Sequence, residues 1–195
     1  MKNNRFILII VIFACLIIGS YYYFAKKDSS EKTNLDPTSE LSQVMYKDLD
    51  NSYPSTPREV IGFYSRILMC YYNEEYTNDQ FEILVEQARK LLDDELLDSN
   101  PIEKHVTNLT KEVEDYKSKK LTIISYTLDD SKDVVYFDYE GDKCAGIKSS
   151  YFMKRNSESF EKVYHQYFLR KDDKGRWKIY GFGAISMDDA QGKDE

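Results

Sequence analysis

The sequence predicts an α+β domain that follows a single apolar segment at the N-terminus. Three observations support this prediction. Residues 6–25 carry no charged side chain, apolar residues recur at helical spacing between residues 56 and 119, and the apolar period changes to two after Lys120. Helices that precede a meander of antiparallel strands are typical of α+β domains, in which the helices cover one face of a curved sheet.

The first segment, Phe6–Ala25, is long enough to cross a membrane as a helix. Its 20 uncharged residues match a hydrocarbon core of ~30 Å and exceed the ~7–15 apolar residues of a signal peptide. Tyr21–Tyr23 stand where an interfacial aromatic belt is expected. Lys2 and Arg5 precede the span, so we expect a single-pass cell-membrane anchor over residues 1–25 with a cytoplasmic N-terminus.

Two alternatives to an uncleaved anchor stay open. Ile12–Cys15 loosely resembles a lipobox, which would make Cys15 a lipidation site, and cleavage elsewhere is the second alternative. All three interpretations place the domain outside the cytoplasm or at the outer face of the membrane.

The rest of the chain divides by composition. Residues 26–47 are polar with scattered charge and predict a flexible tether. The domain is expected over residues 48–187, beginning with an ordered lead-in at Asp48–Pro54. The acidic tail, residues 188–195, is expected to be disordered.

Three helices are predicted from their start signals and apolar stripes. The first begins with Thr56 as N-cap, Pro57 in the first turn and Glu59 completing a capping box, and it ends near Asn73. The second begins at Thr77, with Gln80 in the matching position. The third runs from Pro101 to about Lys119 with apolar residues along one face.

Five strands follow, separated by turn residues. Alternating apolar and polar positions and the turn signals at 140–142 and 172–175 delimit them. The predicted strands are Leu121–Tyr126, Val134–Tyr139, Cys144–Lys154, Phe160–Arg170 and Trp177–Ala184.

Composition and motifs exclude several functions. The formal net charge is −7, and Lys2 and Arg5 are the charged residues of the first 25, which leaves −9 for the rest; such an acidic chain is not expected to bind nucleic acid. The three cysteines are not clustered, so no metal site is expected, and no phosphate-binding glycine loop or hydrolase motif predicts a cofactor. Cys70 and Cys144 are either buried free thiols or one disulfide, which an extracytoplasmic location would permit.

Two stretches carry a resemblance to known families. Asp48–Val60 and Tyr71–Thr77 resemble an uncharacterised family of small membrane-anchored proteins from Gram-positive bacteria, a domain of unknown function that implies no activity. Asp173–Ile179, with Trp177, is similar to the closing hairpin of NTF2-like (cystatin-like) domains, where the tryptophan packs inside an α+β cone. The resemblance implies such a cone, although all long helices here precede the strands.

The NTF2-like resemblance also implies where a site would lie. Enzymes with this fold use an Asp, His or Tyr inside the cone, which makes Asp138 and His165 candidates for acid–base chemistry. Both could equally be structural, and His105 is expected at the surface. If a pocket exists, its expected lining is Tyr164, His165, Tyr167 and Trp177.

The tyrosines are unusually numerous, 17 in all. Tyr71, Tyr72 and Tyr76 cluster at the end of the first helix and could form a partner surface, because tyrosine combines a large apolar ring with a polar tip. The alternative is a core that uses tyrosine in place of leucine or phenylalanine.

The leading functional hypothesis is a non-catalytic, membrane-anchored, extracytoplasmic binding module of the bacterial cell envelope. Its partner would be an envelope protein or ligand, and a homodimer is expected because NTF2-like domains often pair through the sheet. A bitopic scaffold subunit of a secretion or conjugation machine is one alternative. A small-molecule enzyme that uses Asp138 and His165 in a cone pocket is another.

Overall fold

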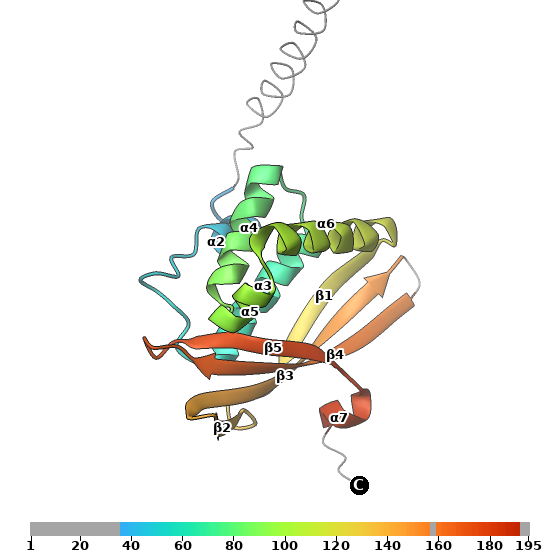
Figure 1. Ribbon diagram of the computed structural model, residues 1–195. Helices are drawn as coiled ribbons and strands as arrows, with labels where there is room; N and C mark the ends of the chain where they lie inside the picture. The colour runs from blue at the N-terminus through green and yellow to red at the C-terminus, as the bar shows by residue number, and fades with distance from the viewer. Residues whose placement is uncertain (1–35, 157–158, 192–195) are drawn as a thin grey trace, which may run out of the picture. The chain divides into compact units, whose positions relative to one another are not determined.

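The computed structural model describes residues 36–156 and 159–191, which form six helices and one five-stranded antiparallel sheet. The α+β class and the five strands predicted from the sequence are confirmed, and the helices lie mainly on one side of the sheet (Figure 1). The helices are α2 (Glu40–Met45), α3 (Pro57–Asn73), α4 (Asn78–Lys90), α5 (Asp94–Ser99), α6 (Ile102–Ser118) and α7 (Met187–Gln191). The strands are β1 (Leu121–Leu128), β2 (Val135–Tyr139), β3 (Asp142–Arg155), β4 (Ser159–Lys171) and β5 (Trp177–Ile185).

The sheet order is β1-β3-β4-β5, with β2 paired to β3. Both β1 and β2 pair with β3. Strand β2 pairs with the start of β3, at Asp142–Gly146, and β1 pairs with the end of β3, at Ser149–Arg155. The long strands β3 and β4 therefore form the centre of the sheet.

Strand register decides which residues face the helices. Ile147 pairs with Tyr167 and Ser149 pairs with His165, whereas Gly146 pairs with Phe168 on the opposite face. Because side chains alternate along a strand, every second residue of β3 and β4 points to the helical layer. The burial pattern agrees with this assignment: the helix-facing core is fully buried and includes Val60, Ile61, Ile67, Leu84, Leu91, Ile147, Leu169 and Ile179.

Capping boxes fix the starts of α3 and α4, at the positions predicted from the sequence. Thr56 and Glu59 form the predicted capping box of α3, with Pro57 at its start. Thr77 and Gln80 form the same motif at α4. Each box satisfies backbone N–H groups that the first helical turn leaves without a partner.

Two tight turns fix the register of the hairpins. Glu140 and Gly141 connect β2 to β3, and both have positive φ, which the right-handed twist of a two-residue hairpin favours. In the β4–β5 turn, Gly175 has φ 75° and Asp172 Oδ1 accepts hydrogen bonds from the backbone N–H groups of Lys174 and Arg176. These turns lie where the sequence predicted them.

Ordered structure begins earlier than the sequence predicts. Residues 26–47 were expected to be a flexible tether, but Glu40–Met45 form α2, which begins at the N-cap Ser39. Leu41, Val44 and Met45 are buried against the neighbouring helices, and the six-residue helix is too short for its apolar period to stand out in sequence.

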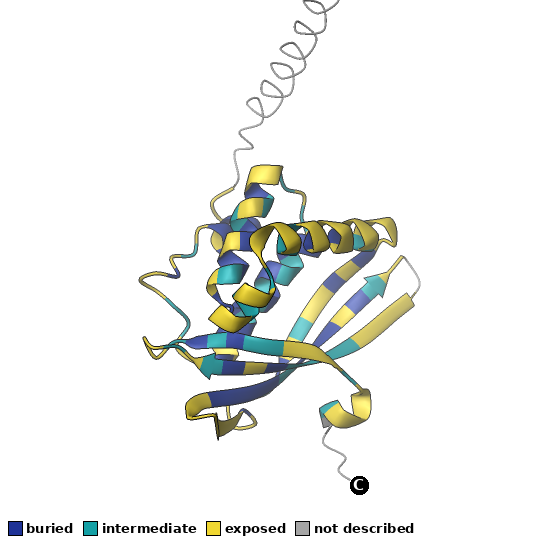
Figure 2. Ribbon diagram, in the orientation of Figure 1, coloured by how far each residue is buried: buried dark blue, intermediate teal, exposed yellow. Residues whose placement is uncertain are grey.

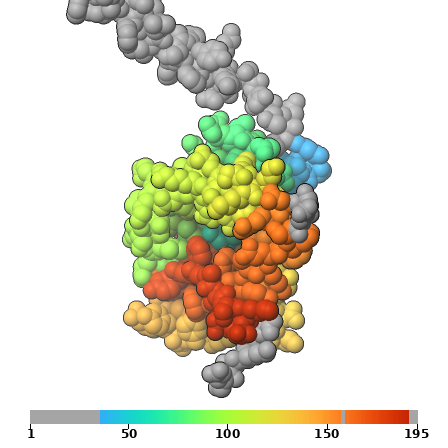
Figure 3. All heavy atoms as spheres, turned by 90° about the vertical axis from the view of Figure 1, so that its right-hand side faces the viewer, coloured from blue at the N-terminus to red at the C-terminus, as the bar shows by residue number. Residues whose placement is uncertain are grey.

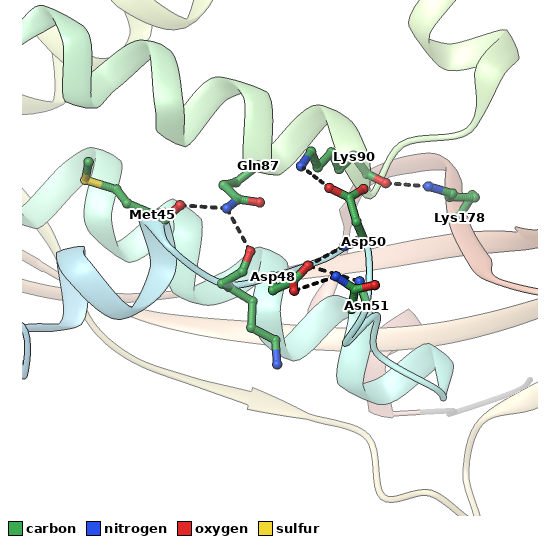
Figure 4. A network of polar contacts seen from close by, with 8 residues as sticks. Met45, Asp48, Asp50, Asn51, Gln87, Lys90 and Lys178 are labelled. Atoms are coloured by element: carbon green, nitrogen blue, oxygen red, sulfur yellow. Dashed lines mark hydrogen bonds and ion pairs between the residues drawn. The ribbon is translucent and has the colours of Figure 1, made fainter.

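A network of polar contacts holds the segment after α2 in place (Figure 4). Gln87 of α4 donates from Nε2 to the carbonyl oxygens of Met45 and Lys47, at 2.6 and 3.0 Å. Lys90 Nζ bonds to Asp50 at 3.2 Å. Side chains of α4 thus hold the lead-in to the domain through bonds to its backbone and to Asp50, and these long-range contacts have no signal in the sequence.

The ends of the chain are described only in part. No helix among residues 36–156 and 159–191 is long and apolar enough to cross a bilayer. The anchor predicted at 6–25, together with Cys15, lies outside the described residues. Of the predicted disordered tail, residues up to 191 form the end of α7, where the Asp189 carbonyl accepts a hydrogen bond from Lys148 Nζ.

Both cysteines of the described region are buried free thiols. Cys70 lies on α3 and Cys144 on β3, and they form no disulfide with each other. Burial raises the pKa of Cys70 to about 12, so its thiol stays protonated at neutral pH. The free-thiol alternative of the sequence analysis is therefore the one that the structure shows.

Candidate functional site

A cavity of about 280 Å³ lies between α3, α6 and the helix-facing side of the sheet. The space-filling view shows it as a hollow bounded by α6 in yellow-green, β4 in orange and β5 in red (Figure 3). Its volume lies just below the ~300–1,000 Å³ that is usual for small-molecule sites.

Helix α6 forms one wall of the cavity, because several of its residues line the space between the helix and the sheet. Most of its surface is exposed, with Leu109 and Val113 as its buried residues (Figure 2). The residues that α6 contributes to the cavity recur at three- and four-residue intervals and so share one helical face. They are His105, Asn108, Leu109, Glu112 and Tyr116.

A chain of hydroxyl groups forms the base of the cavity. Ser65 of α3 bonds to the Tyr151 hydroxyl at 2.9 Å, and that hydroxyl bonds to the Tyr167 hydroxyl at 2.9 Å. The Tyr64 ring meets Tyr167 edge-on at 6.0 Å, and Phe182 of the β5 edge lies 5.7 Å from Tyr167. Hydrogen bonding and ring packing together hold these aromatic side chains in defined orientations.

His165 lies in the sheet wall between two of these rings. Its ring centroid is 5.5 Å from that of Tyr151 and 6.1 Å from that of Tyr167. Its Nδ1 is buried and has no hydrogen-bond partner among the described residues. Burial lowers the pKa of His165, and the Glu112 carboxylate opposes this to a smaller extent, so the imidazole is neutral at pH 7.

His105 is a lining residue, not the surface residue that the sequence analysis expected. Arg89 donates from Nη1 to His105 Nδ1 at 3.2 Å and to the Asn100 carbonyl at 2.8 Å. Because Arg89 can only donate, His105 Nδ1 accepts, and the proton of the neutral ring is assigned to Nε2. Burial and the neighbouring Arg89 charge both lower the pKa of His105.

Glu112 is the carboxylate of the cavity wall. The Tyr72 hydroxyl donates to Glu112 Oε1 at 2.6 Å, and the Tyr72 ring stacks on Tyr116 at 4.2 Å. This bond joins α3 to α6 and places the carboxylate beside two aromatic rings. Glu112 itself is exposed. Tyr71, by contrast, is only 2% exposed, and its buried hydroxyl has no hydrogen-bond partner within the described part of the chain.

The structure brings two of the four predicted pocket residues into this cavity. His165 and Tyr167 line it. Tyr164 points to the opposite face of β4, where it borders a shallow hollow near Lys162 and Met187. Trp177 is buried but packs against Tyr136, with ring centroids 5.8 Å apart, and is not part of the lining.

Asp138 does not meet His165. It forms an ion pair with Lys143, its partner across the β2–β3 ladder, at 2.8 Å, and its side chain is 62% exposed. The β3 partners of Asp138 and His165 are Lys143 and Ser149, which are about 20 Å apart at ~3.3 Å per residue. The predicted acid–base pair is therefore not assembled in this structure.

The predicted tyrosine partner surface is also corrected. Tyr71 and Tyr72 are buried, and their rings pack against each other 6.5 Å apart. Tyr76 is half-buried, donates to the Tyr71 carbonyl at 2.8 Å and stacks on Phe81 at 5.6 Å. The alternative interpretation, a core that uses tyrosine, describes this cluster.

Most of the lining was not predicted from the sequence. Glu112 and Tyr116 could have been found from their helical spacing with His105, but that face was not separated from the apolar face of α6. Tyr64 and Tyr151 carried no such signal, because the cavity joins residues far apart in the chain. Among residues 36–156 and 159–191, no group of three or more potential metal ligands gathers.

The fold and its site thus define an α+β protein with a tyrosine-lined cavity between a five-stranded sheet and its helical layer. The chain belongs to the family described as a domain of unknown function (DUF6715), whose model matches residues 1–182. Membership of an uncharacterised family, as the sequence predicted, is confirmed. No curated protein matches the chain.

Proposed function

We propose that the protein is a non-catalytic binding module of the bacterial cell envelope that holds a small molecule in the cavity below α6. The observation that carries this proposal is a cavity of about 280 Å³ whose wall contains two buried polar groups that bond to no described residue, Tyr71 Oη and His165 Nδ1. Leaving such groups unbonded costs free energy, and a ligand that bonds to them recovers it.

The rest of the proposal concerns location. Residues Phe6–Ala25 serve as a single-pass anchor with the N-terminus in the cytoplasm, so that the domain stands outside the membrane. Helices packed on one face of an antiparallel sheet, with a cavity between the two layers, support an NTF2-like cone for this domain. A tethered receptor needs only modest affinity, because the membrane keeps its local concentration high.

The test is recovery of the bound molecule. The full-length chain is purified from membranes of its native cells, denatured, and the released small molecules are identified by mass spectrometry. Asn108 is exposed on α6 and borders the cavity, so Asn108→Trp is expected to fill the entrance and remove the released compound. Thr110→Trp adds the same bulk to an exposed position outside the lining and is expected to retain it.

Recovery of the same compounds from both variants, or of none from the wild-type chain, would contradict the proposal.

A second candidate function, a scaffold subunit of a secretion or conjugation machine, is favoured by one observation. Phe160 and Phe152 stack in parallel at 5.4 Å on the outer face of the sheet, with Phe160 57% exposed. An envelope protein that copurifies in stoichiometric amount, unaffected by Asn108→Trp, would support this second function.

A further inference from the structure

The charges of the cavity wall restrict which ligand the cavity can hold. This inference rests on the proposed binding function. Among the described residues that line the cavity, Glu112 is the one carboxylate, and there is no lysine or arginine. The two histidines, His105 and His165, are neutral at pH 7 because burial lowers the pKa of each. The wall therefore carries a net negative charge.

The Glu112 carboxylate is free to accept a ligand. Its Oε1 accepts from the Tyr72 hydroxyl at 2.6 Å, and within the described part of the chain no other hydrogen bond or ion pair reaches Glu112. Two nearby cations, Arg89 and Lys117, lie outside the lining, and neither bonds to Glu112. Arg89 bonds to the Asn100 carbonyl and to His105, and Lys117 pairs with Glu75 at 3.5 Å.

The aromatic rings add to the same electrostatic character. The face of a tyrosine ring carries negative charge density and attracts cations, most strongly where water is excluded. Six tyrosines line the cavity within the described residues: Tyr64, Tyr71, Tyr72, Tyr116, Tyr151 and Tyr167. The apolar body of a ligand would lie against Leu68, Leu92 and Met153.

We infer that the cavity binds an organic monocation, an amine or quaternary ammonium group carried by a small apolar body. The cationic group lies at Glu112, beside the Tyr72–Tyr116 stack, and the body fills the space towards the sheet. Glu112 is exposed at the edge of the cavity, and a neutral ligand would gain no charge interaction from it. An anion would be repelled by Glu112 and would find no cationic side chain among the described residues of the lining.

The test compares three probes of similar size and different charge: benzylammonium, benzyl alcohol and benzoate. Each is titrated at pH 7 by calorimetry into the full-length chain in lipid nanodiscs. Partition of the probes into lipid is the same for every protein variant, so differences between variants report binding to the protein. Benzylammonium is expected to bind about tenfold more tightly than benzyl alcohol, and benzoate is expected to bind most weakly.

Two variants on α6 test whether Glu112 causes the preference for benzylammonium. Glu112→Gln is expected to lower the benzylammonium affinity to that of benzyl alcohol, while the affinity for benzyl alcohol stays unchanged. Glu114→Gln makes the same charge change at an exposed position outside the lining and is expected to leave all three affinities unchanged. Asn108→Trp is expected to abolish binding of every probe.

The outcomes separate the two proposals. Equal affinity for benzylammonium and benzyl alcohol, with no effect of Glu112→Gln, would overturn the monocation inference and leave the binding function standing. Binding of the probes that Asn108→Trp does not reduce would overturn the proposed function itself.

Discussion

At the scale of single residues, the cavity depends on polar side chains that bond to each other inside an apolar core. Tyr151 is central because its hydroxyl connects Ser65 of α3 with Tyr167 of β4. All three side chains are buried, so water does not replace a lost bond. The tyrosines therefore serve two purposes: their rings fill the core, and their hydroxyls set the orientation of the cavity wall.

Tyr151→Phe should destabilise the protein by about 1–3 kcal/mol, because it keeps the ring but leaves Ser65 Oγ and Tyr167 Oη buried without their shared partner. Urea denaturation followed by circular dichroism measures the free energy of unfolding. Tyr126→Phe is the matched control. Tyr126 is half-buried and its hydroxyl bonds to none of the described residues, so a change within about 0.5 kcal/mol is expected. Equal effects of the two substitutions would show that the hydroxyl chain contributes nothing.

At the scale of elements, helix starts and strand bulges place the cavity residues. The capping box at Thr56 fixes where α3 begins and therefore which of its faces carries Tyr64 and Ser65. In the β4–β5 ladder the register shifts after Phe168, so that Tyr180 of β5 has no partner in β4 and Phe182 lies opposite Tyr167. Bulges bend a strand and re-aim its side chains, and here the shift brings Phe182 to the cavity.

Removal of the Thr56 cap tests how much the capping box of α3 contributes to stability. Thr56→Ala removes the hydroxyl that accepts from the Glu59 N–H at 3.2 Å, and the expected cost is about 1 kcal/mol of unfolding free energy. Thr110→Ala, at an exposed position inside α6, should cost nothing measurable or stabilise slightly, because alanine has the higher helix propensity. Thermal unfolding of both variants provides the comparison, and a cost at position 110 as large as that at 56 would contradict the capping argument.

At the scale of the whole described domain, one buried ion pair joins the helical layer to the sheet. Arg170 of β4 bonds through Nε and Nη2 to both carboxylate oxygens of Asp93, the N-cap of α5, at 3.1 and 2.5 Å. The exposed fractions of the two side chains are 15% and 7%. Next to this pair the backbone of Leu91 and Asp93 bonds to Ile179 of β5, which covers that part of the edge strand.

Arg170→Met should destabilise the protein by ~3–5 kcal/mol, because it leaves the Asp93 carboxylate buried without a counter-charge. Lys90→Met removes a cation from an ion pair whose Asp50 side chain is 76% exposed, and its expected cost is at most about 1 kcal/mol. Guanidinium denaturation of the two variants measures the difference. If Arg170→Met cost no more than Lys90→Met, the buried pair would not be what holds α5 to the sheet.

The sequence by itself determined the class of the fold, the starts of α3 and α4, the five strands and the two hairpin turns. These features follow from interactions between residues close in the chain: a cap reaches three residues ahead, and a turn involves four. His165 and Tyr167 were predicted in the cavity because alternation along β4 places them on one face with buried Leu169.

Only the tertiary structure decided which of these local features meet. Ser65 and Tyr151 are 86 residues apart, and nothing in either neighbourhood indicates that their hydroxyls bond. The same holds for Tyr72 and Glu112, 40 residues apart, whose bond turns a predicted surface tyrosine into part of a cavity wall. Long-range contacts of this kind depend on how the helices pack on the sheet, and no short-range pattern in the chain records that packing.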